Sequence, residues 1–151
     1  MHKKISPIHS RMQHRAEKLR EQLPMPLSFT GNLGLAEVRI KKIPRKLKAH
    51  SSINDKSSSL GANGYIFLKT KRKFKTYKVK LKNSNTFLDR KFDTEAKVLE
   101  YIAGYLSNNT NTRGEIFLYT EKKPCISCEN VIKQFKNKYP GVLIKVFWDR
   151  S

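Results

Sequence analysis

Cysteine is scarce in this chain of 151 residues, which holds Cys125 and Cys128 and no others. Two cysteines three positions apart do not make a disulfide framework, so their spacing indicates a metal site or a redox pair. Long apolar runs are also missing, and none approaches the roughly 20 residues that cross a bilayer. The basic stretch 1–23 lacks the apolar core of a secretory signal peptide. We therefore expect delivery outside the cell to depend on information elsewhere.

Acidic residues are few, because 12 Asp and Glu stand against 32 Lys and Arg and give a net charge of +20. Residues 1–90 hold 22 basic and 5 acidic residues, whereas residues 91–151 hold 10 and 7. A polycationic half favours a polyanionic partner, since neutralising phosphates releases their counterions. The sequence therefore predicts binding to nucleic acid and no membrane insertion, with solubility or attraction to a membrane surface as the simpler explanations of the charge.

The length suits one domain with one core, preceded by a polar arm. Residues 8–22 have a basic helical pattern with a weak apolar stripe, and Pro24 and Pro26 end it. The sequence thus divides into a basic N-terminal helical arm or linker, residues 1–35, and a domain, residues 36–151.

The first part of the domain is predicted to hold short strands. Apolar and charged residues alternate over 36–43, and a polar loop rich in Ser, Asn and Gly covers 51–64. Residues 65–71 and 76–82 predict a hairpin whose second strand carries a row of lysines on one face. The lysines of that row that we expect to bind substrate phosphate are Lys78 and Lys80.

Longer periodic segments follow residue 91. An amphipathic helix with a wide apolar face is followed by an apolar strand, a second helix that begins after a proline, and a last apolar strand. A helix between two strands predicts a parallel pair with a crossover connection, and hence an α/β sandwich with a sheet of about five strands. These segments are 94–108, 115–120, 125–139 and 142–148.

Reactive side chains stand at the starts of both helices. One start reads DTE at residues 93–95, and the other reads PCISC at residues 124–128. Cysteines three apart share a helix face, and the dipole at a helix N-terminus favours their thiolates. Zinc deaminases combine such a P-C-x-x-C with an H-x-E, whose carboxylate moves a proton from water to the leaving ammonia. Without a second cysteine pair, the pattern favours a catalytic zinc site over a structural one.

The stretch FDTEAKVLEYIAGYL…GEIFLYTEKKPCISCENVIKQFKNKYPGVLIKV resembles the toxin-deaminase families of bacterial polymorphic toxins, within the cytidine-deaminase-like superfamily, and the similarity covers residues 92–147. The piece 48–55, KAHSSIND, is similar to part of the N-terminal portion of that family. The resemblance implies a three-layer α/β sandwich with a mixed sheet. It also implies a zinc ion bound by Cys125 and Cys128, with Glu95 as the general acid and base.

The third zinc ligand is open at this point. Most of the superfamily has His or Cys where this chain has Asp93. A carboxylate binds zinc at about 2.0–2.2 Å, so Asp93 is a feasible ligand, although an acid at a helix start is also an ordinary N-cap. His50 is the rival third ligand, because the other three histidines lie in residues 1–35. His50 and Ser51 are also predicted to contact the substrate.

The resemblance implies partners as well. Toxin-deaminase domains sit at the end of a larger secreted toxin and act in the cytoplasm of the target cell, and a cognate immunity protein, often acidic, protects the producer. We expect a deaminase of cytosine in DNA or RNA, acting on a single-stranded or flipped-out base. The alternatives are a catalytically silent nucleic-acid-binding module, which does not need Glu95, and a deaminase of free nucleosides, which gains little from a polycation.

Overall fold

The computed structural model describes residues 6–76, 78–80, 87–124 and 126–150, with the backbone alone for 78–80, 87–90 and 150. Cys125 and the side chains of Lys78 and Lys80 therefore lie outside the described residues. The elements, in chain order, are α1 (Pro7–Gln22), β1 (Leu33–Arg39), β2 (Lys46–His50), β3 (Lys78–Lys80), β4 (Phe87–Asp89), the 3-10 helix η1 (Arg90–Phe92), α2 (Thr94–Leu106), β5 (Gly114–Lys122), α3 (Ile126–Lys138) and β6 (Val142–Arg150).

The long strands form one mixed sheet in the order β2-β1-β5-β6. β1 runs antiparallel to both β2 and β5, whereas β5 and β6 are parallel and are joined through α3. Parallel neighbours cannot be joined by a tight turn, so the chain must cross over through a helix. The predicted parallel pair with its crossover helix is confirmed.

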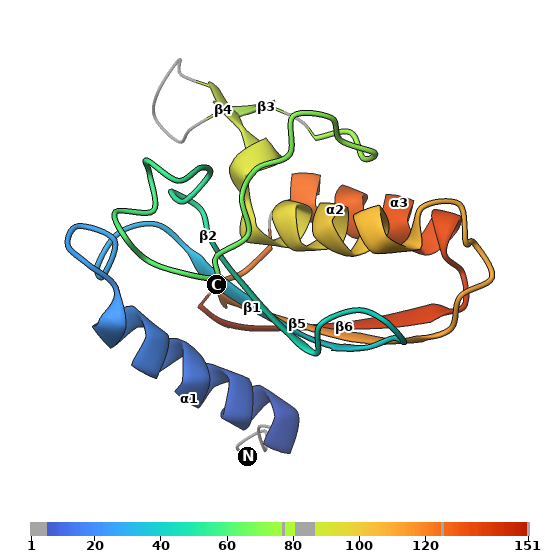
Figure 1. Cartoon of the computed structure of the whole chain (residues 1–151), viewed down its shortest axis with the longest axis horizontal. Helices are drawn as coiled ribbons and strands as arrows, with labels where there is room; N and C mark the ends of the chain where they lie inside the picture. The colour runs from blue at the N-terminus through green and yellow to red at the C-terminus, as the bar shows by residue number, and fades with distance from the viewer. Residues whose placement is uncertain (1–5, 77, 81–86, 125, 151) are drawn as a thin grey trace.

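Helices cover both faces of the sheet (Figure 1). α1 lies on one face, and α2 and α3 pack beside each other on the opposite face. Successive side chains of β1 point to opposite faces of the sheet, so β1 contributes to the cores on both faces. Leu33 and Leu35 belong to the core cluster near α1, while Ala36 and Val38 belong to the cluster near α2 and α3. The predicted three-layer α/β sandwich is confirmed.

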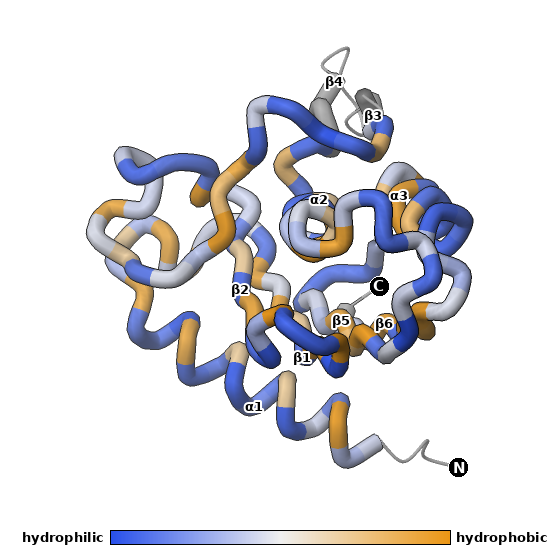
Figure 2. The backbone as a smooth tube through the Cα atoms, turned by 45° about the vertical axis from the view of Figure 1, so that its right-hand side comes forward, coloured by the Kyte–Doolittle hydropathy of each residue, from blue (hydrophilic) through white to orange (hydrophobic). Residues whose placement is uncertain are grey.

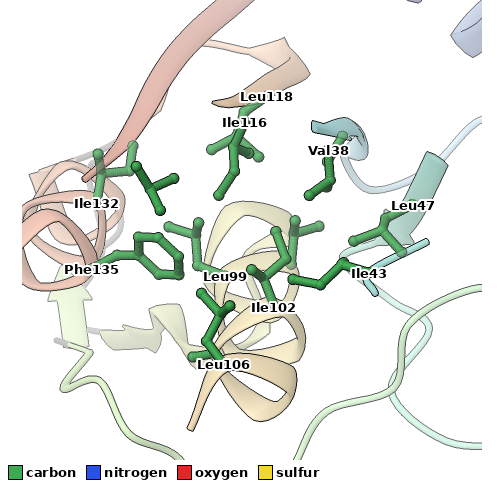
Figure 3. Packing of buried hydrophobic residues seen from close by; sticks show 14 of the residues in the cluster. Val38, Ile43, Leu47, Leu99, Ile102, Leu106, Ile116, Leu118, Ile132 and Phe135 are labelled. Carbon is green, nitrogen blue, oxygen red and sulfur yellow. The ribbon is translucent and has the colours of Figure 1, made fainter. Parts of the chain in front are cut away.

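The larger core cluster fills the space between the sheet and the α2–α3 layer (Figure 3). Leu99 and Ile102 of α2 are fully buried there, and they meet Phe135 of α3 and Ile116 of β5. Figure 2 shows the same division along the chain, with a largely hydrophilic α1 and mostly hydrophobic central strands. Burial of this apolar surface fixes the starts of α2 and α3 relative to the sheet.

The main sheet has four strands instead of about five, because the described residues of 65–71 and 76–82 do not pair with each other. The first of these segments runs beside β2, where Tyr65 makes an isolated parallel bridge to Lys48, and β3 pairs with β4 in a separate two-stranded sheet. Tyr65 and Phe74 are both buried. Tyr65 belongs to the core cluster near α1, and Phe74 belongs to the cluster near α2 and α3, so the segment is held by the two cores.

Residues 7–35, in the segment assigned to an arm or linker, pack against the sheet. Met12 and Ala16 of α1 are buried in one cluster with Leu27 and with Tyr119 of β5. β1 itself begins at Leu33, ahead of the expected boundary at residue 36. In the part of the chain that the structure describes, no helix is both long enough and apolar enough to cross a membrane.

Candidate active site

The starts of α2 and α3 meet above the sheet because α2 comes unusually close to β1. A Cβ atom on Gly34 of β1 would lie 2.4 Å from Thr94 Oγ1 and 2.6 Å from Thr94 Cβ. Only glycine leaves room for this approach, since real Cβ contacts essentially never fall below 3.0 Å. Gly34 therefore determines how close the start of α2 lies to the sheet. Asp93 and Glu95, on either side of Thr94, are positioned by this contact.

Asp93 occupies the N-cap position of α2, but within the described residues its side chain makes no hydrogen bond that caps the helix. Its Oδ2 instead lies 3.0 Å from Cys128 Sγ in the first turn of α3. The backbone carbonyl of Asp93 still accepts the first helical hydrogen bond, from Lys97 N at 3.1 Å. The carboxylate is thus directed at the neighbouring helix, as a metal ligand would be.

Glu95 is buried at 3% exposure in the first turn of α2. Its Oε2 lies 2.8 Å from Cys128 Sγ, and Thr94 Oγ1 donates to its Oε1 at 3.1 Å. Burial raises the pKa of Glu95, and the nearby charge of Asp93 raises it further. A carboxyl group with a raised pKa holds a proton more readily than a free carboxylate, which suits a group that accepts a proton and returns it.

The donor set fits a cation. One ligand atom each from Asp93, Glu95 and Cys128 lies within 4.8 Å of the others. Carboxylates and a thiol gathered at low exposure are costly in their charged forms unless a cation neutralises them. Zinc binds both thiolate sulfur and carboxylate oxygen, and it keeps an open position in catalytic sites. Cys125 lies outside the described residues, so its part in this site stays a prediction.

His50, the rival third ligand, is not part of this group. It is fully buried at the end of β2, and its Nε2 donates to the carbonyls of Thr30 at 2.8 Å and Leu27 at 3.1 Å. Its Nδ1 accepts from Ser52 N at 3.1 Å. These partners fix a neutral ring with both nitrogens occupied, and burial lowers the pKa of His50 accordingly.

Ser51, also predicted to contact substrate, is tied to the start of β1. Its Oγ accepts from Asn32 N at 2.8 Å, and its own backbone N donates to Asn32 O at 2.9 Å. These bonds hold the turn after β2 in place beside the β1 end that carries Gly34. The structure therefore gives Ser51 a backbone-fixing role.

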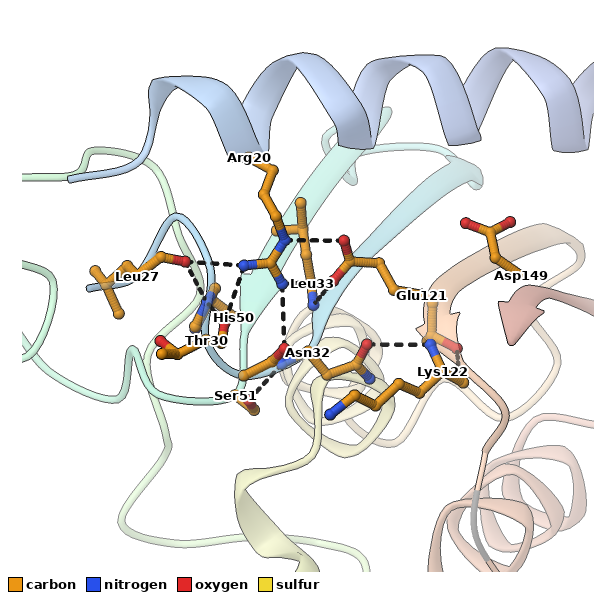
Figure 4. A network of polar contacts seen from close by, with 12 residues as sticks. Arg20, Leu27, Thr30, Asn32, Leu33, His50, Ser51, Glu121, Lys122 and Asp149 are labelled. Atoms are coloured by element: carbon orange, nitrogen blue, oxygen red, sulfur yellow. Dashed lines mark hydrogen bonds and ion pairs between the residues drawn. The ribbon is translucent and has the colours of Figure 1, made fainter. Parts of the chain in front are cut away.

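A polar network that the sequence analysis missed joins α1 to this end of the sheet (Figure 4). Arg20 of α1 forms a bidentate ion pair with Glu121 of β5, with Nη2 to Oε1 at 2.5 Å and Nε to Oε2 at 2.9 Å. The guanidinium of Arg20 also donates to the backbone carbonyls of Leu27, Thr30 and Gly31. Glu121 Oε1 in turn accepts from Leu33 N at 2.9 Å. An acid at the end of an otherwise apolar strand was the available signal for this partner.

Lys97 was also missed, and it links α2 to the turn that carries His50. Its side chain is buried, and Nζ donates to His50 O at 2.5 Å, Ile53 O at 2.8 Å and Asn54 Oδ1 at 3.0 Å. Burial lowers the pKa of Lys97 from 10.5 to about 7. Because α2 is apolar on most of its surface, a lysine in its second turn had to find buried partners.

A family model described as "Toxin-deaminase: The BURPS668_1122 family of deaminases" matches residues 16–150. Neither a curated protein nor a solved structure matches the chain. The matched region spans the C-terminal part of α1, the main sheet and both helix starts that carry the Asp93, Glu95 and Cys128 group.

Proposed function

Because the chain belongs to the toxin-deaminase family, we propose that it is a zinc-dependent hydrolase that converts cytosine to uracil in nucleic acid. The observation that carries this proposal is the meeting of Asp93, Glu95 and Cys128 at the starts of two helices. Hydrolytic deamination consumes one water and releases one ammonia. It therefore needs a site that activates water and a group that carries the proton between the two.

The zinc ion would be held by Asp93, Cys125 and Cys128. Asp93 is favoured over His50 as the third ligand because its Oδ2 already faces Cys128 Sγ, while both ring nitrogens of His50 are occupied. Cys125 enters from the sequence, three residues before Cys128. When bound, zinc would act as the Lewis acid that makes water acidic enough to react near neutral pH.

Glu95 would move the proton. Its Oε2 faces the proposed zinc ligands, and its raised pKa suits a group that takes a proton from water and gives it to the departing amino nitrogen. Thr94 Oγ1 donates to the other oxygen and fixes the rotamer of the carboxyl group. A silent binding module needs no such buried acid, so this arrangement supports the enzyme.

The charge of the chain supports a nucleic-acid substrate. A cleft of about 390 Å³ between α1 and the β1–β2 hairpin is lined by Arg11, Arg39, Arg45 and Lys46, together with Glu37. It lies on the α1 face of the sheet, opposite to the candidate active site, so it adds to the general attraction of the chain for a polyanion and does not line the reaction site. We further propose delivery by a larger toxin, action in the cytoplasm of the target cell, and an acidic immunity protein as a partner that neutralises the +20 chain.

The test uses purified protein, single-stranded DNA and RNA oligonucleotides that contain one cytosine, and a measurement of bound zinc. We expect uracil to form in one of the two polymers and about one zinc per chain. Glu95→Gln keeps the shape of the side chain but cannot carry the proton, so the rate should fall by roughly 10²- to 10⁴-fold with zinc retained.

Glu129→Gln is the matched control, because Glu129 is an exposed acid in the first turn of α3. It should leave both rate and zinc unchanged. Full activity of Glu95→Gln would show that the proposed proton carrier is wrong, and a chain that edits neither polymer would refute the nucleic-acid substrate.

A further inference from the structure

A row of residues crosses the sheet beneath the start of α2 and ends at an exposed indole. In the register of the sheet, Gly34 of β1 lies beside Ala49 of β2 and Thr120 of β5, and Thr120 lies beside Trp148 of β6. Gly34 is the residue on which Thr94 rests. The row therefore leads from directly below the candidate active site to the edge strand of the sheet.

Trp148 points to the same side of the sheet as the active site. Side chains alternate along a strand, and Ile144 and Val146 of β6 pack on the core cluster beneath α2 and α3. The side chain of Phe147 points to the opposite face of the sheet, because it stacks on His9 of α1 with ring centroids 5.1 Å apart. Trp148 thus shares the face of Val146, one step closer to the end of β6.

The indole lies at the rim of the site and is open to solvent. Neighbouring strands are about 4.8 Å apart, so β6 is about 10 Å from Gly34, or about three stacking steps of 3.4 Å along a nucleic-acid strand. Trp148 is 41% exposed, although the rest of its row is buried. β6 is an edge strand of the main sheet, so no further strand of that sheet covers it.

Exposed lysines follow Thr120, the partner of Trp148 on β5. Lys122 is the last residue of β5 and pairs with Arg150 of β6, Lys123 follows it, and both lysines are exposed. An aromatic face next to lysines is the combination that holds single strands, since bases stack on the ring while the cations attract the phosphates. A free nucleoside offers neither a second base nor a backbone to such a surface.

We propose that Trp148 stacks on an unpaired base within about three nucleotides of the reacting base, so that the substrate is a single-stranded or locally unpaired polynucleotide. This inference rests on the proposed function and names the substrate class of the same site. Trp148 acts in substrate binding and specificity and takes no part in the proton transfer.

The chain has one tryptophan, so the tryptophan fluorescence of the protein reports on Trp148 alone. The experiment uses zinc-loaded Glu95→Gln protein, to prevent turnover, and titrates it with a single-stranded cytosine oligonucleotide. A second oligonucleotide of equal length carries abasic sites at about three positions on each side of the cytosine. We expect the first to quench the indole and the second, which has the same phosphates, to leave it nearly unchanged.

Kinetics on the active protein give the second readout. Trp148→Ala should raise KM for the single-stranded oligonucleotide by about 5- to 150-fold with little change in kcat, and Trp148→Phe should restore most of the loss. Leu143→Ala is the matched control, because Leu143 is an exposed apolar residue near the other end of β6. It should behave as the unaltered protein does.

Equal quenching by both oligonucleotides, or an unchanged KM for Trp148→Ala in a protein that deaminates, would overturn the inference and leave the indole to a protein partner. A different result would contradict the proposed function without contradicting the stacking site. A chain that edits neither polymer but whose indole is quenched by the base-bearing oligonucleotide alone would refute the deaminase proposal while supporting the stacking site.

Discussion

Gly34→Ala is expected to damage the active site without touching any of its reactive groups. The added Cβ would stand 2.4 Å from Thr94 Oγ1 and 2.6 Å from Thr94 Cβ. Carbon atoms pack at about 3.5–4.0 Å, so the start of α2 must rise from β1 by roughly 1 Å. Cys128 lies on α3 and does not follow this movement, so its sulfur separates from the carboxylates of Asp93 and Glu95.

The two effects of this substitution differ in size. Overpacking costs about 1–3 kcal/mol, and the gain of an alanine over a glycine in a strand offsets about 0.5–1 kcal/mol of it. The free energy of unfolding should therefore fall by at most about 2.5 kcal/mol. A displacement of about 1 Å between reacting groups costs on the order of 10²-fold in rate. Activity should thus fall much further than stability.

The assay combines urea unfolding, bound zinc and kcat on the cytosine oligonucleotide. Gly104→Ala in α2 is the control, because the only close atoms there belong to the flexible end of Lys69, and alanine favours a helix by about 1 kcal/mol. An unaltered kcat for Gly34→Ala would refute the reasoning that this contact positions the site.

Two further predictions concern the buried charges around the site. Between pH 7 and 10.5 the unfolded chain holds a proton on Lys97 that the folded chain has largely released, so the free energy of unfolding should rise with pH by up to about 1.4 kcal/mol per unit. Urea unfolding across this range should show that rise in the natural chain and not in Lys97→Met, and parallel pH profiles would contradict the burial of the amine. Arg20→Met leaves Glu121 without its two-pronged partner, and unfolding should become easier by about 2–4 kcal/mol. Lys18→Met, at an exposed position of α1, is the control, and an equal effect of both substitutions would show that the network contributes nothing specific.

Local sequence was sufficient for the second half of the fold. The apolar spacing over 94–108 and 125–139 predicted α2 and α3, and the apolar runs between and after them predicted β5 and β6. Each of these patterns is contained within about 15 residues, and burial of one face follows from it directly. The placing of an acidic motif and a cysteine motif at two helix starts was equally readable from the sequence.

The partners of individual side chains were decided by the tertiary structure. Asp93 could cap α2 or face a metal, and its direction toward Cys128 depends on contacts between segments 35 residues apart. His50 was an open candidate until residues 27–30 occupied its ring, and the exposure of Trp148 follows from the edge position of β6. Spacing along the chain determines which face of an element a residue takes. What meets that face is determined only when distant segments pack together.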